Sequence, residues 1–194
     1  MNTTRIIKLI LPLMILGLAT GACKRSYTPK PHGYFRISFP EKKYVRYNGP
    51  CPYTFEYPVY ARVEKDREPD AAPCWLNISF PAYHGKLHLT YKTIHGDLGQ
   101  MLEDTYSLAY KHTVKADAIH ERAYNDTVRK VYGILYDIRG NAASNVQVYL
   151  TDSVRHFMRG ALYFDLVPDK DSLAPVVSFI RQDIIHMIET FSWK

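Results

Sequence analysis

Hydrophobic and polar residues alternate with a period of two through most of the first half of the chain. Between Gly33 and Phe39, for example, Phe35, Ile37 and Phe39 fall on one side and the residues between them on the other. Such alternation predicts a half-buried β-strand. Similar runs, each bounded by proline, glycine, asparagine or a charge cluster, predict further strands at Tyr53–Tyr57, Val59–Val63, Cys74–Phe80 and Leu87–Tyr91.

The period changes to that of an α-helix in two later stretches. Apolar residues from Leu98 to His112 lie at helical spacing behind Asp97, a residue type that suits an N-cap. A second helical stripe runs from Leu173 to Phe191, with Pro175 in its first turn. Between the two helices the alternation returns and predicts an antiparallel meander with strands at 119–124, 129–138, 145–151 and 155–165.

The order of strands, helix, strands and helix lacks the regular strand–helix alternation that builds a parallel sheet. It predicts an α+β domain, with a largely antiparallel sheet and two packed helices. No internal repeat occurs, so a single domain over residues 34–194 is expected. This order of elements resembles the PsbP/Mog1-like architecture of several small envelope proteins.

The start of the chain predicts an export signal. Two basic residues precede the apolar stretch Leu9–Leu18, which is too short to span about 30 Å of hydrocarbon and suits a cleavable signal peptide at residues 1–22. Small residues then lead directly into Cys23, as in a bacterial lipoprotein cleavage site. We therefore expect a lipid on Cys23. The alternative is an ordinary secreted protein in which a cysteine lies at this place by chance.

Residues 23–33 would then form a lipidated N-terminus and a proline-rich tether, which Pro29 and Pro31 hold extended. Two or more acyl chains hold a protein stably on a membrane, so we expect a location in the cell envelope. The stretch after Cys23 has no acidic run, which favours an anchor that faces the periplasm. The sequence does not say whether the membrane is the inner or the outer one.

Composition excludes several classes of protein. With 46% hydrophobic and 23% charged residues, the chain is neither disordered nor fibrous. The formal net charge is +6, of which Arg5 and Lys8 would leave with the signal peptide. An excess of this size, without an arginine stripe, does not indicate a nucleic-acid partner.

Two cysteines, Cys51 and Cys74, remain beside Cys23. An even pair outside the cytosol predicts a disulfide, which would close the charged stretch between Glu64 and Pro73 into a loop. The alternatives are two buried free thiols, or a metal or redox site, for which neither CxxC nor paired metal-ligand spacing occurs.

Motifs for other chemistry are sparse. His84 and His88 are four residues apart beside a predicted strand, where such positions lie about 13 Å apart, so they could not share one ion. Neither HExxH nor a phosphate-binding glycine loop occurs. We expect no metal and no cofactor other than the covalent lipid.

One loop between two meander strands is unusually rich in small residues. It consists of Gly140, Asn141, Ala142, Ala143, Ser144 and Asn145. It is either a simple hairpin connection or a flat docking surface that a partner backbone can approach closely. Two further alternatives are an envelope hydrolase that uses Ser144 with His156 and an acid, although GxSxG is absent, and a carrier of a small ligand or lipid, which needs a pocket of about 300 Å³ or more.

Several segments together resemble the gliding motility lipoprotein GldD family of the Bacteroidetes. They are KPHGYFRISFPEKKY after Cys23, CPYTFEYP at 51–58, CWLNISFP at 74–81, LTYK at 89–92, the GNAAS loop with its strands at 131–164, and the ending FSWK. The resemblance implies a lipoprotein accessory to the gliding machinery and the associated type IX secretion system. It implies no known enzymatic chemistry and no catalytic residues. We therefore expect a protein that docks onto envelope proteins of that apparatus. Only Cys23, as the lipid site, transfers by motif. The resemblance does not say whether the organism glides, which protein is the partner or what the oligomeric state is.

Overall fold

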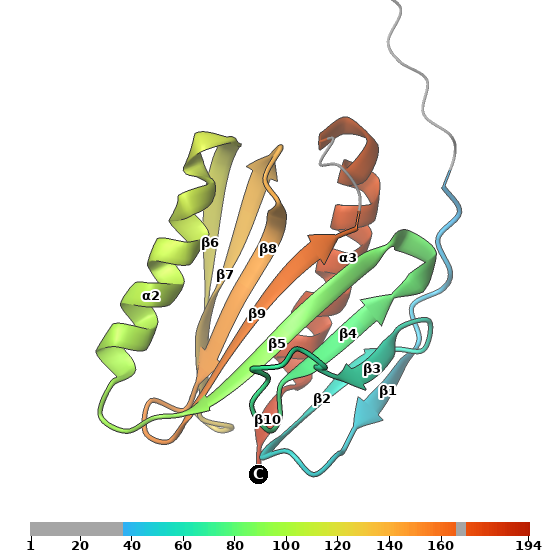
Figure 1. Ribbon diagram of the computed structural model, residues 1–194. Coiled ribbons are helices and arrows are strands. Elements are labelled where there is room, and N and C mark those ends of the chain that lie inside the picture. Colours follow the sequence, from blue (N-terminus) through green and yellow to red (C-terminus); the bar gives the residue numbers. More distant parts are fainter. Residues whose placement is uncertain (1–36, 166–169) are drawn as a thin grey trace, which may run out of the picture. The chain divides into compact units, whose positions relative to one another are not determined.

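In the part of the chain that the structure describes, antiparallel sheets and two long helices make up the fold (Figure 1). The computed structural model describes residues 37–165 and 170–194. In this part of the chain the larger sheet has seven strands in the order β3-β4-β5-β9-β8-β7-β6, and every neighbouring pair is antiparallel. The strands are β3 (Arg62–Lys65), β4 (Leu76–Phe80), β5 (Gly85–Thr93), β6 (Ala116–Asp126), β7 (Val131–Gly140), β8 (Ser144–Thr151) and β9 (His156–Phe164).

A smaller sheet joins the beginning of the described chain to its end. It has the strand order β1-β2-β10, with β1 at Tyr44–Tyr47, β2 at Tyr53–Pro58 and β10 at Ser192–Trp193. The helices are α2 (Leu98–Tyr110) and α3 (Lys170–Thr190), and the short 3-10 turns are η1 (Pro81–Tyr83) and η2 (Lys111–Val114). Among the described helices, none is both long and apolar enough to cross a bilayer.

The α+β class predicted from the sequence is confirmed. Strands β6 to β9 pair consecutively as the predicted antiparallel meander. Both predicted helices are present, the first as α2 and the second as α3. Asp97 stands directly before α2, but its carboxylate accepts a hydrogen bond from the backbone N–H of His95 at 2.8 Å and does not cap the helix.

Two predicted strands differ from the structure. The run from Gly33 to Phe39 lies partly outside the described residues, and residues 37–39 are not in a strand. Phe39 instead stacks on Phe179 of α3, with ring centroids 4.3 Å apart. The strand predicted at Val59–Val63 begins only at Arg62, because the chain turns where the N–H of Ala61 donates to the carbonyl of Pro58. In the first case the alternating apolar residues therefore contact a helix, and in the second they lie in a turn.

One face of the large sheet packs against α3. Leu87 and Leu89 of β5, for example, are about 1% exposed and share a core with Ile180 and Ile184 of the helix. A hollow of about 10 Å³ lies in this layer, which is room for about one water molecule. The layer between α3 and the sheet is therefore filled by the protein's own side chains.

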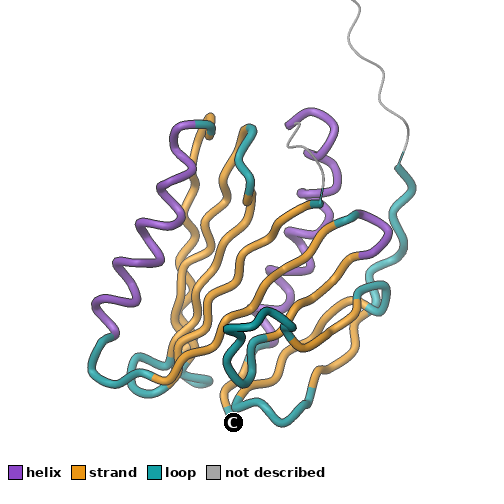
Figure 2. Tube along the Cα trace, in the orientation of Figure 1, coloured by secondary structure: helices purple, strands orange, loops and turns teal. Residues whose placement is uncertain are grey.

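The opposite face carries α2. Ala109 of the helix packs against Tyr136, Ile138 and Ala142. Successive residues of a strand point to opposite faces, so Leu135 lies in the core beneath α3 while Tyr136 lies beneath α2. Figure 2 shows α3 passing behind β5 and β9, whereas α2 stands over the other end of the sheet. Because of this offset, α2 covers only part of its face.

A buried carboxylate on α3 fixes the beginning of the domain. Asp183, whose side chain is 1% exposed, accepts hydrogen bonds from Lys42 Nζ at 2.7 Å and from the hydroxyls of Tyr44 at 3.0 Å and Tyr60 at 2.7 Å. Burial lowers the pKa of Lys42, and the contact with Asp183 opposes that shift. Burial and Asp183 both raise the pKa of the two tyrosines. Lys42 and Tyr44, which follow the proposed tether, are thus held on α3.

Candidate functional site

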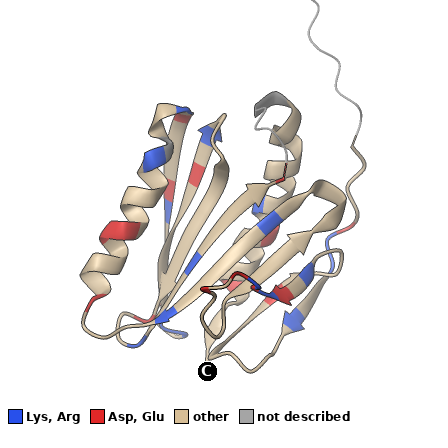
Figure 3. Cartoon of the chain, viewed as in Figure 1, with Lys and Arg blue, Asp and Glu red and all other residues tan. Residues whose placement is uncertain are grey.

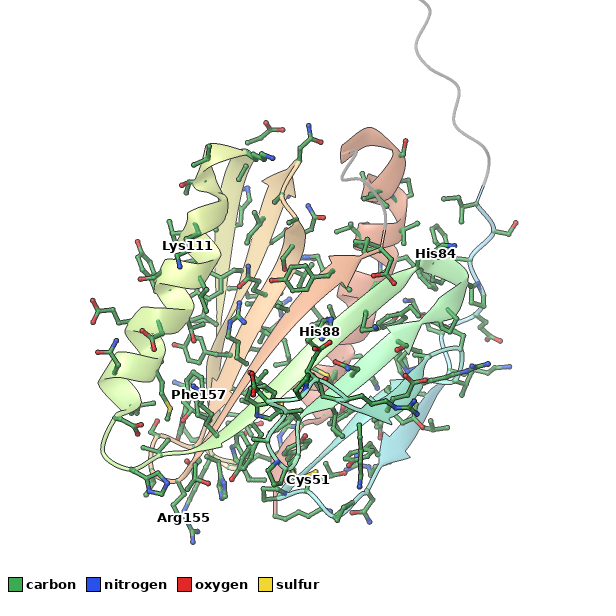
Figure 4. The ribbon with its side chains drawn as sticks, in the orientation of Figure 1. Cys51, His84, His88, Lys111, Arg155 and Phe157 are labelled. Carbon is green, nitrogen blue, oxygen red and sulfur yellow. A yellow bond between two sulfur atoms is a disulfide. The ribbon has the colours of Figure 1, made fainter. Side chains whose placement is uncertain are left out.

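The open part of the α2 face forms a groove, which we call the α2 groove. It is lined by Trp75, Lys92, Met101, Leu108, Phe157 and Arg159, among others. Its floor follows from strand register, because Thr90 of β5 lies opposite Arg159 of β9, and Lys92 lies opposite Phe157. Figure 4 places Phe157 near the beginning of α2 and His88 closer to the start of β5.

The groove has a narrow part and a wide part. The narrow part has a volume of about 200 Å³ and lies between α2 and the floor. A wider hollow of about 530 Å³ continues from Lys92 and Met101 toward Pro73 and the start of α2. The two parts share Lys92, Met101 and Asp104 in their linings, so they lie next to each other along the start of the helix.

Arg159 is the most unusual side chain of the floor. One guanidinium nitrogen, Nη2, donates to Gln147 Oε1 at 2.6 Å, while Nε is buried without a hydrogen-bond partner. No described carboxylate lies within ion-pairing distance of it. Burial lowers the pKa of Arg159, and the hydroxyl of Tyr163 opposes this shift. Arginine ordinarily titrates above 12, so the side chain keeps its charge in a partly dry site.

Gln147 lies beside Arg159 on the same face. Its side chain has 0% exposure, and its Nε2 atom has no partner among the described residues. Buried polar groups are normally hydrogen-bonded, because an unpaired one costs free energy of desolvation. Gln147 and Arg159 are therefore two buried polar side chains that each keep one nitrogen without a hydrogen-bond partner among the described residues.

Charge differs between the floor and the rim of the groove. Figure 3 shows basic segments on β5 and acidic segments on α2 and in the loop that follows β3. On the rim, Asp104 of α2 accepts a hydrogen bond from Gln100 at 2.8 Å. On the floor, Lys92 and Arg159 are the charged side chains that line the narrow part. A negative group would therefore be attracted to the sheet and not to the helix.

Cys51 and Cys74 are joined by a disulfide in the structure, with Cα atoms 5.4 Å apart. This distance lies within the usual range for disulfides. The bridge links the residues before β2 to those before β4. Of the charged stretch predicted as a loop, Glu64 and Lys65 lie instead in β3, and the residues after Lys65 lead to Cys74 outside any strand. The hydroxyl of Tyr53 donates to the carbonyl of Cys74 at 2.7 Å, which further fixes this loop to the small sheet.

Reduction of this disulfide is expected to lower the free energy of unfolding by about 3 kcal/mol, because the unfolded chain gains the freedom of the opened loop. Urea unfolding with and without dithiothreitol measures the change. The double variant Cys51→Ser/Cys74→Ser should show the same loss and no further response to reductant. An unchanged urea midpoint after reduction would contradict a stabilising bridge.

The small-residue loop at 140–145 is a hairpin connection between β7 and β8. Ser144 is 0% exposed, Ala142 is 2% and Asn145 is 9%, whereas Asn141 and Ala143 are exposed. The side chain of Asn145 donates to the carbonyls of Ile138 at 3.1 Å and Gly140 at 3.3 Å, and so closes the turn. The side chains of Ala142, Ser144 and Asn145 face the interior and are not available to a partner. Docking through the exposed residues Asn141 and Ala143 stays a prediction.

Gly140 has a packing reason to be glycine. Its φ is +109°, and a Cβ at this position would lie 2.7 Å from the backbone nitrogen of Asp117. The small residues of the loop thus allow β7 to pass close to the start of β6. The simple hairpin interpretation explains the composition of the loop.

The hydrolase alternative at Ser144 is contradicted by the geometry. The Ser144 hydroxyl donates to the carbonyl of Val146 at 3.4 Å, within the buried start of β8. His156, the histidine considered for a triad, instead contacts the hydroxyl of Tyr91 at 2.7 Å through Nδ1 and stacks on Trp193. In the described part of the chain, no group of three or more His, Cys, Asp or Glu side chains could hold a metal ion.

Replacing Ser144 by leucine is expected to destabilise the fold by about 1–3 kcal/mol, because the larger side chain must enter a filled interior. The neighbouring change Ala143→Leu, at an exposed position, should alter stability by no more than about 0.5 kcal/mol. Thermal unfolding of the two variants makes the comparison. Equal stability of both variants would show that Ser144 is accessible after all.

The fold and the α2 groove define a small α+β domain whose large sheet is filled on one face and partly open on the other. A family model described as gliding motility lipoprotein GldD matches residues 24–193. The chain belongs to the gliding motility lipoprotein GldD family, as its sequence motifs predict.

Comparison with other known proteins adds a likeness of fold. No curated protein matches the chain. Among solved structures, the chain is similar to cyanobacterial PsbP (CyanoP) from Synechocystis sp. PCC 6803, with 15% sequence identity and a TM-score of 0.49. The match covers 85% of this chain and 100% of that chain. A likeness of this size concerns the fold and carries nothing about function.

Sequence reasoning missed Arg159 at the floor of the α2 groove and Gln147 beside it. Arg159 lies in a predicted strand among apolar residues, and Gln147 lies between two valines of another strand. Arg159 shares a period-two face with Phe157 and Ala161, and a charged side chain on such a face is the signal that could have found it. The alternation places Gln147 opposite its valine neighbours, so the sequence carries no such signal for this residue. The pairing of these two strands, which brings the residues together, was visible only in the structure.

Proposed function

We propose that this chain is a lipid-anchored accessory component of the gliding motility and type IX secretion machinery, which acts by docking onto other envelope proteins and not by catalysis. The single observation that carries the proposal is the GldD family match over residues 24–193. That match begins directly after Cys23, the proposed site of lipidation.

The anchor gives docking a physical advantage. Acyl chains on Cys23 would confine the domain to a membrane surface, and the tether at residues 23–33 would limit its reach. Confinement near a partner raises the effective concentration, so that an interface of modest affinity is sufficient. We place the domain on the periplasmic side, because no acidic run follows Cys23.

The shape of the domain favours docking over the carriage of a small ligand. The layer beneath α3 leaves a hollow of only about 10 Å³. The narrow part of the α2 groove, at about 200 Å³, is smaller than the range of about 300–1,000 Å³ that is usual for small-molecule sites, whereas the wider hollow of about 530 Å³ falls within that range. The wider hollow beside it is open along α2 and suits a surface contact.

Native electrophoresis of membranes extracted with a mild detergent tests the proposal. We expect the full-length chain to migrate in a complex that contains components of the secretion machinery, and the Cys23→Ala chain to be absent from it. An unrelated lipoprotein of the same membranes serves as the control for detergent artefacts. Migration of the wild-type chain alone, in cells that actively secrete, would contradict the docking proposal.

A stoichiometric component also differs from an enzyme in its response to depletion. Because each assembled machine needs its own copy of a docking protein, secretion of cargo should fall in proportion to the amount of the chain. An enzyme can turn over repeatedly, so full secretion after depletion to a few per cent of the normal amount would indicate catalysis instead.

A further inference from the structure

Arg159 in the α2 groove forms no ion pair with any of the described residues. Gln147 holds its side chain at the floor. Lys92, on the neighbouring strand, lines the same narrow part. Removing a cation from water is costly unless an anion or hydrogen-bond acceptors replace that water. A ligand with a carboxylate would supply both.

Apolar side chains surround this charge. Trp75, Met101, Leu108 and Phe157 line the narrow part of the groove together with Arg159. Leu108 is 37% exposed, so the helix presents apolar surface at the mouth of the groove. Aromatic residues, methionine and arginine are the types enriched at the centres of protein interfaces. The occupant should therefore combine a carboxylate with an apolar group.

The dimensions favour a peptide segment as the occupant. The narrow part, at about 200 Å³, has room for a side chain or two but is small for a whole small-molecule ligand. It opens into the hollow of about 530 Å³ that runs past Lys92 and Met101 toward the start of α2. A chain can lie along this path and insert one side chain beneath the helix.

We infer that the α2 groove binds an acidic segment of a partner protein, with a Glu or Asp carboxylate on Arg159 and Lys92 and a neighbouring apolar side chain against Trp75 and Met101. This inference rests on the proposed docking function and names the chemistry of its partner. Asp104 on the helix rim repels the same carboxylate, so the acid enters along the sheet floor.

Fluorescence anisotropy on the full-length lipoprotein in detergent tests the inference. The probes are two fluorescein-labelled peptide pools, one with a single glutamate among leucine, phenylalanine and valine, and a matched pool with glutamine in its place. We expect the glutamate pool to bind roughly tenfold or more tightly, as is found for paired charges in desolvated interfaces. Added salt should weaken this preference, because ions screen the attraction.

Two variants and one control test whether the preference for the glutamate pool arises in the α2 groove. Arg159→Gln removes the charge but retains hydrogen-bonding capacity, and should abolish the preference for glutamate. Leu108→Glu, at a partly exposed helix position, adds a repelling charge and should do the same even where Arg159→Gln fails to fold. Arg155→Gln, which changes an exposed arginine in the turn before β9, should leave the preference intact.

Three results would overturn the inference. They are equal binding of the two pools, an unchanged preference in Leu108→Glu, and complete displacement of the peptide by octanoate at an equal concentration, which would indicate a site for small acids. Failure of the proposed function is distinguishable from these. A Leu108→Glu chain that still migrates in the native membrane complex would remove the groove from docking, whereas a wild-type chain outside any complex would remove docking itself.

Discussion

Replacing Asp183 by alanine is expected to lower the free energy of unfolding by about 3–5 kcal/mol, the usual cost of removing one partner from a buried ion pair. The carboxylate accepts hydrogen bonds from Lys42, Tyr44 and Tyr60, so its loss strands one ammonium group and two hydroxyls. Lys42 Nζ retains the carbonyl of Phe179 at 2.8 Å but loses its counter-ion. Urea unfolding of the purified chain measures the loss of unfolding free energy.

A control on the same helix distinguishes the loss of a buried carboxylate from the loss of a negative charge anywhere on α3. Glu189 is 53% exposed and lies 3.8 Å from Arg122, so Glu189→Ala should cost no more than about 1 kcal/mol. Adding Lys42→Met to Asp183→Ala should recover part of the loss, because it removes the stranded charge. If Asp183→Ala and Glu189→Ala are equally stable, the buried network does not hold the beginning of the domain.

The second large effect concerns location and not stability. Replacing Cys23 by alanine, behind an ordinary secretory signal peptide that is cleaved without lipidation, is expected to move nearly all of the chain from the membrane fraction to the soluble fraction and to abolish secretion of type IX cargo. The thiol of Cys23 is the proposed acceptor of the acyl chains, and without them residence on a membrane is lost. Fractionation followed by immunoblotting measures the distribution, and extracellular cargo measures the function.

Ser26→Ala, three residues along the same tether, is the matched control and should leave both readouts unchanged. The fold of Cys23→Ala, checked by thermal unfolding, should equal that of the wild-type chain. Full secretion by a soluble Cys23→Ala chain would show that the anchor is dispensable. Retention of this variant on the membrane would show that another contact holds the domain there.

The architecture was largely predictable because the hydrophobic period follows local geometry. The meander β6–β9 and both helices show clean periods of 2 and 3.6 over many residues, and the structure has them. The errors lie where an apolar residue serves another purpose. Phe39 lies on Phe179 and not in a strand, and Val59 is 54% exposed in a turn. Period alone does not say which surface an apolar side chain will cover.

The candidate site was less predictable because it depends on strand pairing. Thr90 and Arg159 are 69 residues apart in sequence and become neighbours only through the pairing of β5 with β9. The small residues of the loop at 140–145 were compatible with a docking surface, yet Ser144 is buried within the hairpin. Small size at a turn reports close backbone packing as readily as it reports a binding surface.

The central claim is that acyl chains on Cys23 anchor this member of the GldD family to the membrane at which it works. Mass spectrometry of the N-terminal peptide, from protein extracted out of native membranes, tests it most directly. We predict a peptide that begins at Cys23 and carries diacylglycerol on the thiol. A mature N-terminus at any other residue, or an unmodified Cys23 thiol, would contradict the account.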